Sequence, residues 1–147
     1  MNFFGFRVVF SVLIVLIFHK IDIISACRCR YLDPREQFCR SSFAAIVLIT
    51  KNRVVNTSPR ERVYAVKVIQ KFKSNSTDGH STSLENGKLY STSDSCGVLS
   101  LNLNTKYLIT GGFVDGRARI NLCDFIQELS SVTKQQLDGF GGKYNCN

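Results

Sequence analysis

Six cysteines constrain this 147-residue chain more than any other feature of its sequence. They are Cys27, Cys29, Cys39, Cys96, Cys123 and Cys146. An even number of cysteines in an exported chain predicts disulfides, here three, although six cysteines allow many pairings. A structural zinc cluster is the weaker hypothesis, because a Cys-x-Cys pair without a nearby Cys-x-x-Cys or histidine pair does not match zinc-ligand spacing.

The first 26 residues have the pattern of a secretory signal peptide. Arg7 comes before an apolar run, Val8 to Phe18, and small residues end the segment at Ala26. A run of about 11 residues is too short to cross a bilayer core of about 30 Å as a helix. We expect cleavage after Ala26, so that residues 1–26 are removed and the mature chain begins at Cys27. The protein is then secreted, to the extracellular space or the extracellular matrix, with no membrane span in the mature chain.

Composition indicates that residues 27–147 form one globular domain. The chain is 44% hydrophobic and 20% charged, which is typical of folded proteins, and its formal net charge is +8. The predicted mature chain contains one histidine, His80, and no Ser-His-Asp or paired-carboxylate pattern is evident in it. We therefore expect no enzyme activity and no cofactor of the protein's own.

Capping patterns predict two short helices. Asp33 followed by Pro34, with Glu36 three residues after the cap, predicts a helix that carries Cys39. Near the carboxyl end, the segment from Thr133 to Leu137 predicts a second capped helix, which stops at Gly139.

Two apolar segments predict the first strands. Phe43 to Thr50 is a continuous apolar run with several β-branched residues, as in a buried strand. Val63 to Lys73 alternates, as in a half-buried strand, with lysines on one face and apolar residues on the other. The lysine face comprises Lys67, Lys71 and Lys73, and the apolar face comprises Tyr64, Val66, Val68 and Phe72.

Three further short strands are predicted at Val98 to Leu103, Tyr107 to Phe113 and Ala118 to Leu122. Asp115-Gly116 between the last two is a hairpin signal. Five or six short strands with a helix near each end favour a mainly β fold, a closed or nearly closed antiparallel barrel. Two Asn-x-Ser/Thr sequons, at Asn75 and Asn56, lie in predicted loops and are candidates for glycosylation, the second weakened by Pro59.

Five short motifs occur in one order along the mature chain. They are Cys27-Arg28-Cys29, Gln37-Phe38-Cys39, Cys96-Gly97-Val98, Tyr107-Leu108-Ile109-x-Gly111 and Leu122-Cys123-Asp124-Phe125-Ile126. Together they resemble the amino-terminal, netrin-like (NTR) domain of the tissue inhibitors of metalloproteinases (TIMP), which is an inhibitory domain. The chain stops one residue after Cys146, so we expect the carboxy-terminal TIMP domain to be absent.

The resemblance implies a fold, a disulfide pairing and a function. The fold is a five-stranded oligonucleotide/oligosaccharide-binding (OB) barrel with flanking short helices. The pairs are Cys27–Cys96, Cys29–Cys123 and Cys39–Cys146. The function is inhibition of a zinc metalloproteinase, a matrix metalloproteinase or related metzincin. The resemblance implies that the α-amine and carbonyl oxygen of Cys27 chelate the zinc of the target protease. We expect the inhibitor to be a monomer.

The resemblance also implies which residues contact the protease. They are Cys27, Arg28, Cys29 and Arg30, beside a second ridge that contains Asp94, Ser95 and Cys96. Arg28 departs from the family, in which a small residue at this position enters the S1′ pocket of the protease. Burying an unpaired guanidinium in an apolar pocket could cost several kcal/mol. Arg28 therefore favours a target with a deep or acidic pocket over most matrix metalloproteinases.

Two alternatives remain open at the level of sequence. The cysteines could serve only as disulfide staples in a secreted netrin-like binding module that does not inhibit proteases. Its positive charge would then engage sulfated polysaccharide or an acidic protein partner, with Lys67, Lys71 and Lys73 as the candidate face. The simpler interpretation is that those lysines do no more than solvate an exposed strand. Nucleic acid is not an expected partner, because the chain is predicted to be secreted and lacks an aromatic-basic stacking pattern.

Overall fold

The computed structural model describes residues 27–55, 61–75 and 84–146. The predicted signal peptide, Asn56 and His80 lie outside the described residues, and Asn75 is described and exposed. In the described part of the chain, no helix has both the length and the apolar character needed to cross a membrane.

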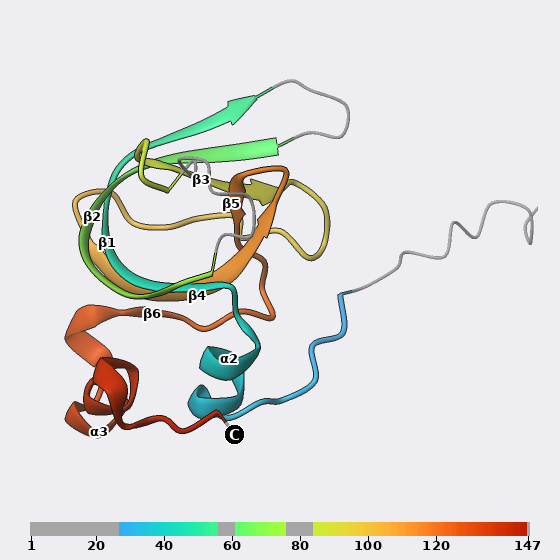
Figure 1. Cartoon of the computed structure of the whole chain (residues 1–147). Coiled ribbons are helices and arrows are strands. Elements are labelled where there is room, and N and C mark those ends of the chain that lie inside the picture. The colour runs from blue at the N-terminus through green and yellow to red at the C-terminus, as the bar shows by residue number, and fades with distance from the viewer. Residues whose placement is uncertain (1–26, 56–60, 76–83, 147) are drawn as a thin grey trace, which may run out of the picture.

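Five strands close into a barrel, and a sixth extends the sheet. The strands are β1 (Phe43–Val55), β2 (Glu61–Ser74), β3 (Lys88–Thr92), β4 (Lys106–Val114), β5 (Arg117–Arg119) and β6 (Ile126–Glu128). The order β1-β2-β3-β5-β4 is closed by pairing of β4 with β1, while β6 pairs only with β4 (Figure 1). The β3–β5 pair is parallel and the other pairs are antiparallel. The predicted mainly β fold with a five-stranded barrel is confirmed.

Helical segments cover one side of the barrel. They are α2 (Pro34–Arg40), the 3-10 turn η1 (Leu129–Ser131), α3 (Lys134–Asp138) and the π-helical turn η2 (Gly139–Lys143). Asp33 caps α2 by accepting a hydrogen bond from the Glu36 amide at 2.8 Å. Thr133 and Gln136 form a reciprocal capping box at the start of α3. Both predicted helices are confirmed, and they lie together below the barrel in Figure 1.

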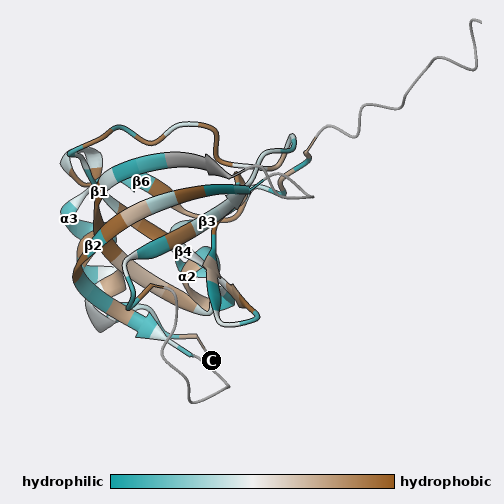
Figure 2. Cartoon of the chain, turned by 90° about the horizontal axis from the view of Figure 1, so that it is seen from above, coloured by the Kyte–Doolittle hydropathy of each residue, from teal (hydrophilic) through white to brown (hydrophobic). Residues whose placement is uncertain are grey.

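The first part of β1 is buried on both faces because it separates two apolar clusters. Phe43, Ala45, Val47 and Ile49 point into the barrel, where Tyr64, Leu89 and Ile109 complete the main cluster. Ala44 and Ile46 point out and pack with Leu108, Phe125 and Phe140 under the helices. The buried strand that the continuous apolar run predicts is confirmed over Phe43 to Ile49. Figure 2 shows hydrophobic stretches along strands of the barrel.

One strand prediction was wrong and another was wrong in part. Residues 98–103 form no strand, since Val98 and Leu101 are buried and Leu99 and Leu103 are exposed, which is not a period of two. This segment instead packs Val98 and Leu101 into the main cluster, and the Tyr64 hydroxyl donates to the Val98 carbonyl at 2.8 Å. Of the strand predicted at 118–122, only the first two residues belong to β5. The hairpin between β4 and β5 is confirmed, with positive φ at Asp115 and Gly116.

The predicted lysine face of β2 was also wrong. The β1–β2 register shifts where Phe72 and Ile69 are extra residues on β2, so the faces of β2 exchange along its length. Phe72 therefore packs in the cluster beneath the helices, although Val68 packs in the barrel. Lys73 turns toward α2, where its Nζ donates to the carbonyls of Phe38 and Cys39, each at 3.0 Å.

Candidate functional site

The segment before α2 has no regular secondary structure, and disulfides fix its path. Cys27 is bonded to Cys96 and Cys29 to Cys123, with Cα–Cα distances of 4.9 and 5.1 Å. The third disulfide joins Cys39 on α2 to Cys146, which ties the helix to the carboxyl end. These are the pairs that the resemblance implies. A chain terminus of this kind would otherwise fray. Two cross-links within three residues hold this segment in one geometry.

The turn that carries Cys96 is built around Asp94. Its Oδ1 accepts hydrogen bonds from the Thr92 hydroxyl at 2.7 Å and from the Cys96 amide at 2.9 Å. The Gly97 amide donates to the Asp94 carbonyl at 3.0 Å. A side chain at Gly97 would collide with the Thr92 carbonyl, so this turn accepts only glycine there without moving. The carboxylate of Asp94 thus has a role inside the turn.

A second turn, residues 121–124, carries Cys123. The Asn121 side chain accepts from the Cys123 amide, and the Asp124 carboxylate accepts from the Asn121 amide, both at 2.8 Å. Burial raises the pKa of Asp124 to about 6, and the hydrogen bond from the Asn121 amide opposes this shift. Gln37 on α2 donates to the Cys123 carbonyl at 3.2 Å, so the helix supports the turn.

The amino-terminal segment and the turn that carries Cys96 form one unit, which we call the Cys27 ridge: residues 27–30 with residues 92–96. The turn of residues 121–124 supports this ridge. The Leu122 amide donates to the Cys96 carbonyl at 2.9 Å, which joins the two turns directly. The Cys27 and Cys123 sulfurs approach to 3.9 Å across the two disulfides. The structure therefore brings together all seven predicted contact residues: Cys27, Arg28, Cys29, Arg30, Asp94, Ser95 and Cys96.

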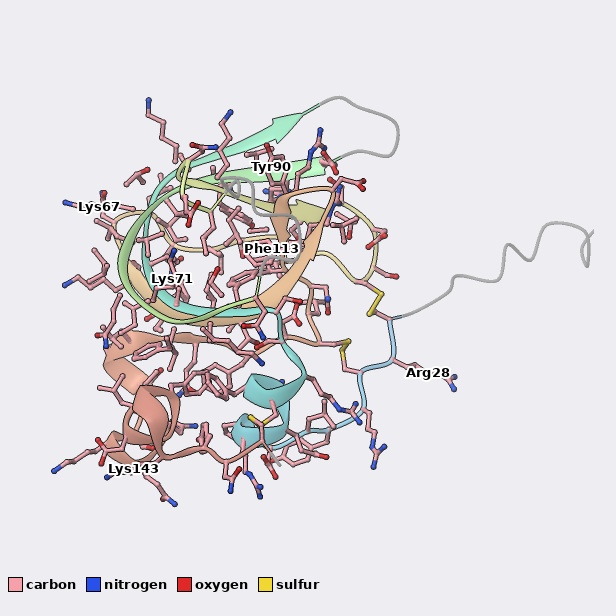
Figure 3. The ribbon with its side chains drawn as sticks, viewed as in Figure 1. Arg28, Lys67, Lys71, Tyr90, Phe113 and Lys143 are labelled. Atoms are coloured by element: carbon pink, nitrogen blue, oxygen red, sulfur yellow. A yellow bond between two sulfur atoms is a disulfide. The ribbon has the colours of Figure 1, made fainter. Side chains whose placement is uncertain are left out.

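The surface of the ridge is exposed and positively charged. Arg28, Arg30, Asp94 and Ser95 are exposed, whereas Cys27 and Cys96 are half-buried. Arg28 extends away from the body of the protein into solvent (Figure 3). An arginine in this position is available to a partner but makes no contribution to the packing of the barrel.

Sequence reasoning missed an apolar rim beside the ridge. Tyr31 is 91% exposed and Leu122 is 54% exposed, so both present large side chains to solvent. Both line a hollow of about 330 Å³, together with Cys29, Gln37 and Cys123. Leu122 is the first residue of one of the five motifs and Tyr31 lies two residues after another. The pairing of Cys29 with Cys123 is the signal that would have brought them together.

The sulfur atoms of Cys27, Cys29 and Cys123 lie within 4.8 Å of one another, a spacing that could suggest a metal centre. All three are oxidised in disulfides. Since the thiolate is the form that ligates metal, this cluster does not fit a metal ion of the protein's own.

Comparison with known proteins agrees with the geometry. A family model described as tissue inhibitor of metalloproteinase matches residues 25–147. The chain is similar to metalloproteinase inhibitor 4 of Mus musculus, with 30% identity over 132 residues that cover 83% of this chain and 57% of the relative. The inhibitor 4 of Rattus norvegicus is 29% identical with the same coverage. The chain thus spans little more than half the length of these relatives. The family match over the whole predicted mature region shows that the chain belongs to the tissue inhibitor of metalloproteinase family.

Proposed function

We propose that this protein is a secreted inhibitor of zinc metalloproteinases that acts through the Cys27 ridge. The observation that carries the proposal is the position of Cys27, which two disulfides hold at the surface beside the turn of residues 92–96. Family membership supports the same class of activity. The target is a matrix metalloproteinase or a related metzincin, and the inhibitor acts as a monomer.

The chemistry requires Cys27 to be the first residue. A catalytic zinc in a protease has three protein ligands and a water, with room for a fifth ligand. After cleavage behind Ala26, the α-amine and carbonyl oxygen of Cys27 are separated by only two bonded atoms and can chelate the zinc together. They displace the water that would attack the substrate. A free α-amine has a pKa of about 8, so losing its proton at pH 7 costs on the order of 1 kcal/mol.

The disulfides lower the entropic cost of this association. Ordering a flexible terminus opposes binding, with a penalty of about 0.5–1.5 kcal/mol for each immobilised side chain. In this protein the cross-links, the hydrogen bond from Leu122 to Cys96 and the support of Gln37 order the segment before the protease arrives. The ridge is a preorganised ligand.

Arg28 directs the choice of target. Its side chain extends from the ridge directly after the chelating residue (Figure 3). A protease pocket that receives it must offer an acidic group or remain open to water, since an apolar pocket would strip the guanidinium of its hydration. We therefore propose that the preferred target has an acidic or deep S1′ pocket.

The test compares two secreted forms of the protein against a panel of matrix and membrane-anchored metalloproteases. One form has a sequenced amino terminus at Cys27, and the other carries one extra alanine before it. We expect inhibition by the first form and a loss of at least 100-fold with the extra alanine, which acylates the amine and displaces it from the zinc. Equal inhibition by both forms would reject chelation. Inhibition by neither would reject the inhibitory function and favour a binding module.

A further inference from the structure

The strands of the barrel carry a large excess of positive charge. Across the described bounds of β1 to β5 the one acidic residue is Glu61, which is paired with Arg117 and Arg119. The basic residues of the same strands are Lys51, Arg53, Arg62, Lys67, Lys71, Lys73, Lys88, Lys106, Arg117 and Arg119. The charges at Glu61, Arg117 and Arg119 lie close to the Cys27 ridge, because Glu61 is paired with Thr92.

Strand register places four of these lysines on one face. Leu48 on β1 is paired with Lys67 on one side and Lys106 on the other. Directly paired residues point to the same face of a sheet, so both lysines share the face of Leu48. The next row runs from Lys51 on β1 through Ala65 on β2 to Lys88 on β3.

The two rows belong to the outer wall of the barrel. Ala65 and Lys67 are two residues apart on a regular part of β2 and therefore share a face. Tyr64 and Val66, which alternate with them, are buried in the main cluster inside the barrel. We call Lys51, Lys67, Lys88 and Lys106 the barrel-wall lysines.

The barrel-wall lysines are exposed and close enough to act together. All four are exposed. With strands about 4.8 Å apart and residues i and i+2 about 7 Å apart, the lysines of one row are about 10 Å apart and the rows about 7 Å. These spacings are comparable with the Debye length of about 8 Å at physiological ionic strength. Within the described residues, no salt bridge involves Lys51, Lys67 or Lys106.

We propose that the barrel-wall lysines bind a sulfated polysaccharide of the heparin class. Lysines on flexible stems, spread over four strands, match a polymer that repeats its sulfate and carboxylate groups along its length. A protein partner would require a buried apolar or aromatic centre, and the residues between these lysines are Ala65 and the half-buried Leu48. Nucleic acid would require exposed aromatic rings on which its bases could stack. The ring of Tyr90, on neighbouring β3, already has the guanidinium of Arg117 over it, 5.2 Å from the ring centre.

This site differs from the stripe suggested by sequence. Of the three lysines in that stripe, Lys67 alone belongs to the barrel-wall set. Lys71 is paired with Glu85 at 3.0 Å, and Lys73 hydrogen-bonds to α2. Lys67 and Arg28 extend from opposite sides of the molecule (Figure 3). A polysaccharide on the barrel wall therefore leaves the Cys27 ridge open, and its binding does not depend on the proposed inhibition.

The test is elution of the secreted protein from immobilised heparin in a salt gradient. The first variant, Lys67→Gln with Lys106→Gln, removes one row. Its matched control, Lys134→Gln with Lys143→Gln, removes the same charge from α3 and η2. A third variant changes all four barrel-wall lysines to Gln, and a fourth changes them to Arg. Circular dichroism is used to check that each variant is folded.

We expect earlier elution for the first variant, unchanged elution for the control and the Arg variant, and at least a tenfold weaker affinity for heparin in the four-Gln variant. Equal effects of the first variant and its control would overturn the proposal in favour of bulk charge. So would failure of the native protein to bind heparin, or tighter binding to DNA or to phosphatidylserine vesicles of matched charge. Inhibition by the four-Gln variant is measured in parallel, so loss of heparin binding and loss of inhibition are separate results.

Discussion

Arg28 is a single residue whose exchange should change the target of the proposed inhibition. It is exposed and extends away from the barrel, so Arg28→Thr removes a charge without disturbing the core. If the S1′ pocket of a matrix metalloproteinase is apolar, removing the cost of burying a guanidinium should improve inhibition by about 10- to 100-fold. Inhibition constants of both forms against the same matrix metalloproteinases provide the measurement. Arg30→Thr is the control, and an unchanged constant for Arg28→Thr would show that Arg28 is not the obstacle.

Asp124 should make the stability of the protein depend on pH. Burial raises its pKa to about 6, so the folded state holds the proton more tightly than the unfolded state, in which the value is 3.8. Stability from this group is therefore full below about pH 4 and is lost as the pH rises through about 6, with a total on the order of 2–3 kcal/mol. In the variant Asp124→Asn, the side chain keeps an oxygen that can accept the hydrogen bond from the Asn121 amide, but it carries no charge.

We therefore expect Asp124→Asn to be more stable than the native protein at pH 7, with the difference shrinking toward pH 4. Urea unfolding of both forms at intervals between pH 4 and pH 7, with the disulfides intact, measures the difference. Parallel stability curves would show that the carboxylate is better solvated than its burial indicates.

At the scale of elements, β2 shows that two lysines alike in sequence can have different roles. The Nζ of Lys73 donates to the last turn of α2 and lies 5.3 Å from the centre of the Phe38 ring, whereas Lys71 forms an exposed salt bridge with Glu85. Burial lowers the pKa of Lys73, but its two carbonyl partners favour the charged form. Lys73→Met should therefore destabilise the fold by about 1–2 kcal/mol, because it removes a charged donor from the Cys39 and Phe38 carbonyls, of which Phe38 still accepts hydrogen bonds from Ser41.

Lys71→Met is the matched control for that prediction. Exposed salt bridges contribute about 0–1 kcal/mol, so its free energy of unfolding should change by less than half as much. Thermal or urea unfolding of the two variants gives the comparison. If both variants lost the same stability, Lys73 would have no special role in joining β2 to α2.

The sequence predicted correctly the helix caps and the hairpin turn, because each depends on residues that are close together in the chain. The caps at Asp33 and Thr133 and the Asp115-Gly116 turn act within a few residues, and all three appear in the structure as expected. The strands β3 and β6 were missed, because each is short and is defined by pairing with β2 or β4 rather than by its own pattern. The register shifts at Phe72 and Ile69 were missed for the same reason, since an alternating pattern cannot show where its partner strand slips.

The ridge could be assembled from sequence only through the family resemblance. Spacing alone left the disulfide pairing open, and the pairing is what brings Cys27 beside Cys96 and Cys29 beside Cys123. The roles of Asp94 and Gly97 inside their turn and the exposed rim of Tyr31 and Leu122 required the three-dimensional arrangement. The barrel-wall lysines likewise come from four different strands, and only the register joins them.

At the scale of the whole molecule, two of the disulfides should separate stability from inhibition. Cys29–Cys123 and Cys39–Cys146 span 94 and 107 positions of the chain, so the loop-closure entropy that each removes from the unfolded state is nearly equal, about 4–5 kcal/mol in the chain-entropy model. Their locations differ. The first holds the Cys27 ridge, and the second joins α2 to the carboxyl end, where Arg35 also donates to the Asn145 carbonyl at 2.7 Å.

Replacing both cysteines of either pair with Ser should therefore lower the free energy of unfolding by similar amounts, measured by denaturant titration. The inhibition constants of the two variants should differ even though their free energies of unfolding are similar. Below the temperature at which either variant unfolds, loss of Cys29–Cys123 frees the ridge and should weaken inhibition at least tenfold, because the terminus must then be ordered on binding. Loss of Cys39–Cys146 should leave the inhibition constant within about twofold of the native value, since the contacts of the ridge do not involve that disulfide. Equal weakening in both variants would mean that inhibition depends on the rigidity of the entire domain, not on the local restraint of the Cys27 ridge.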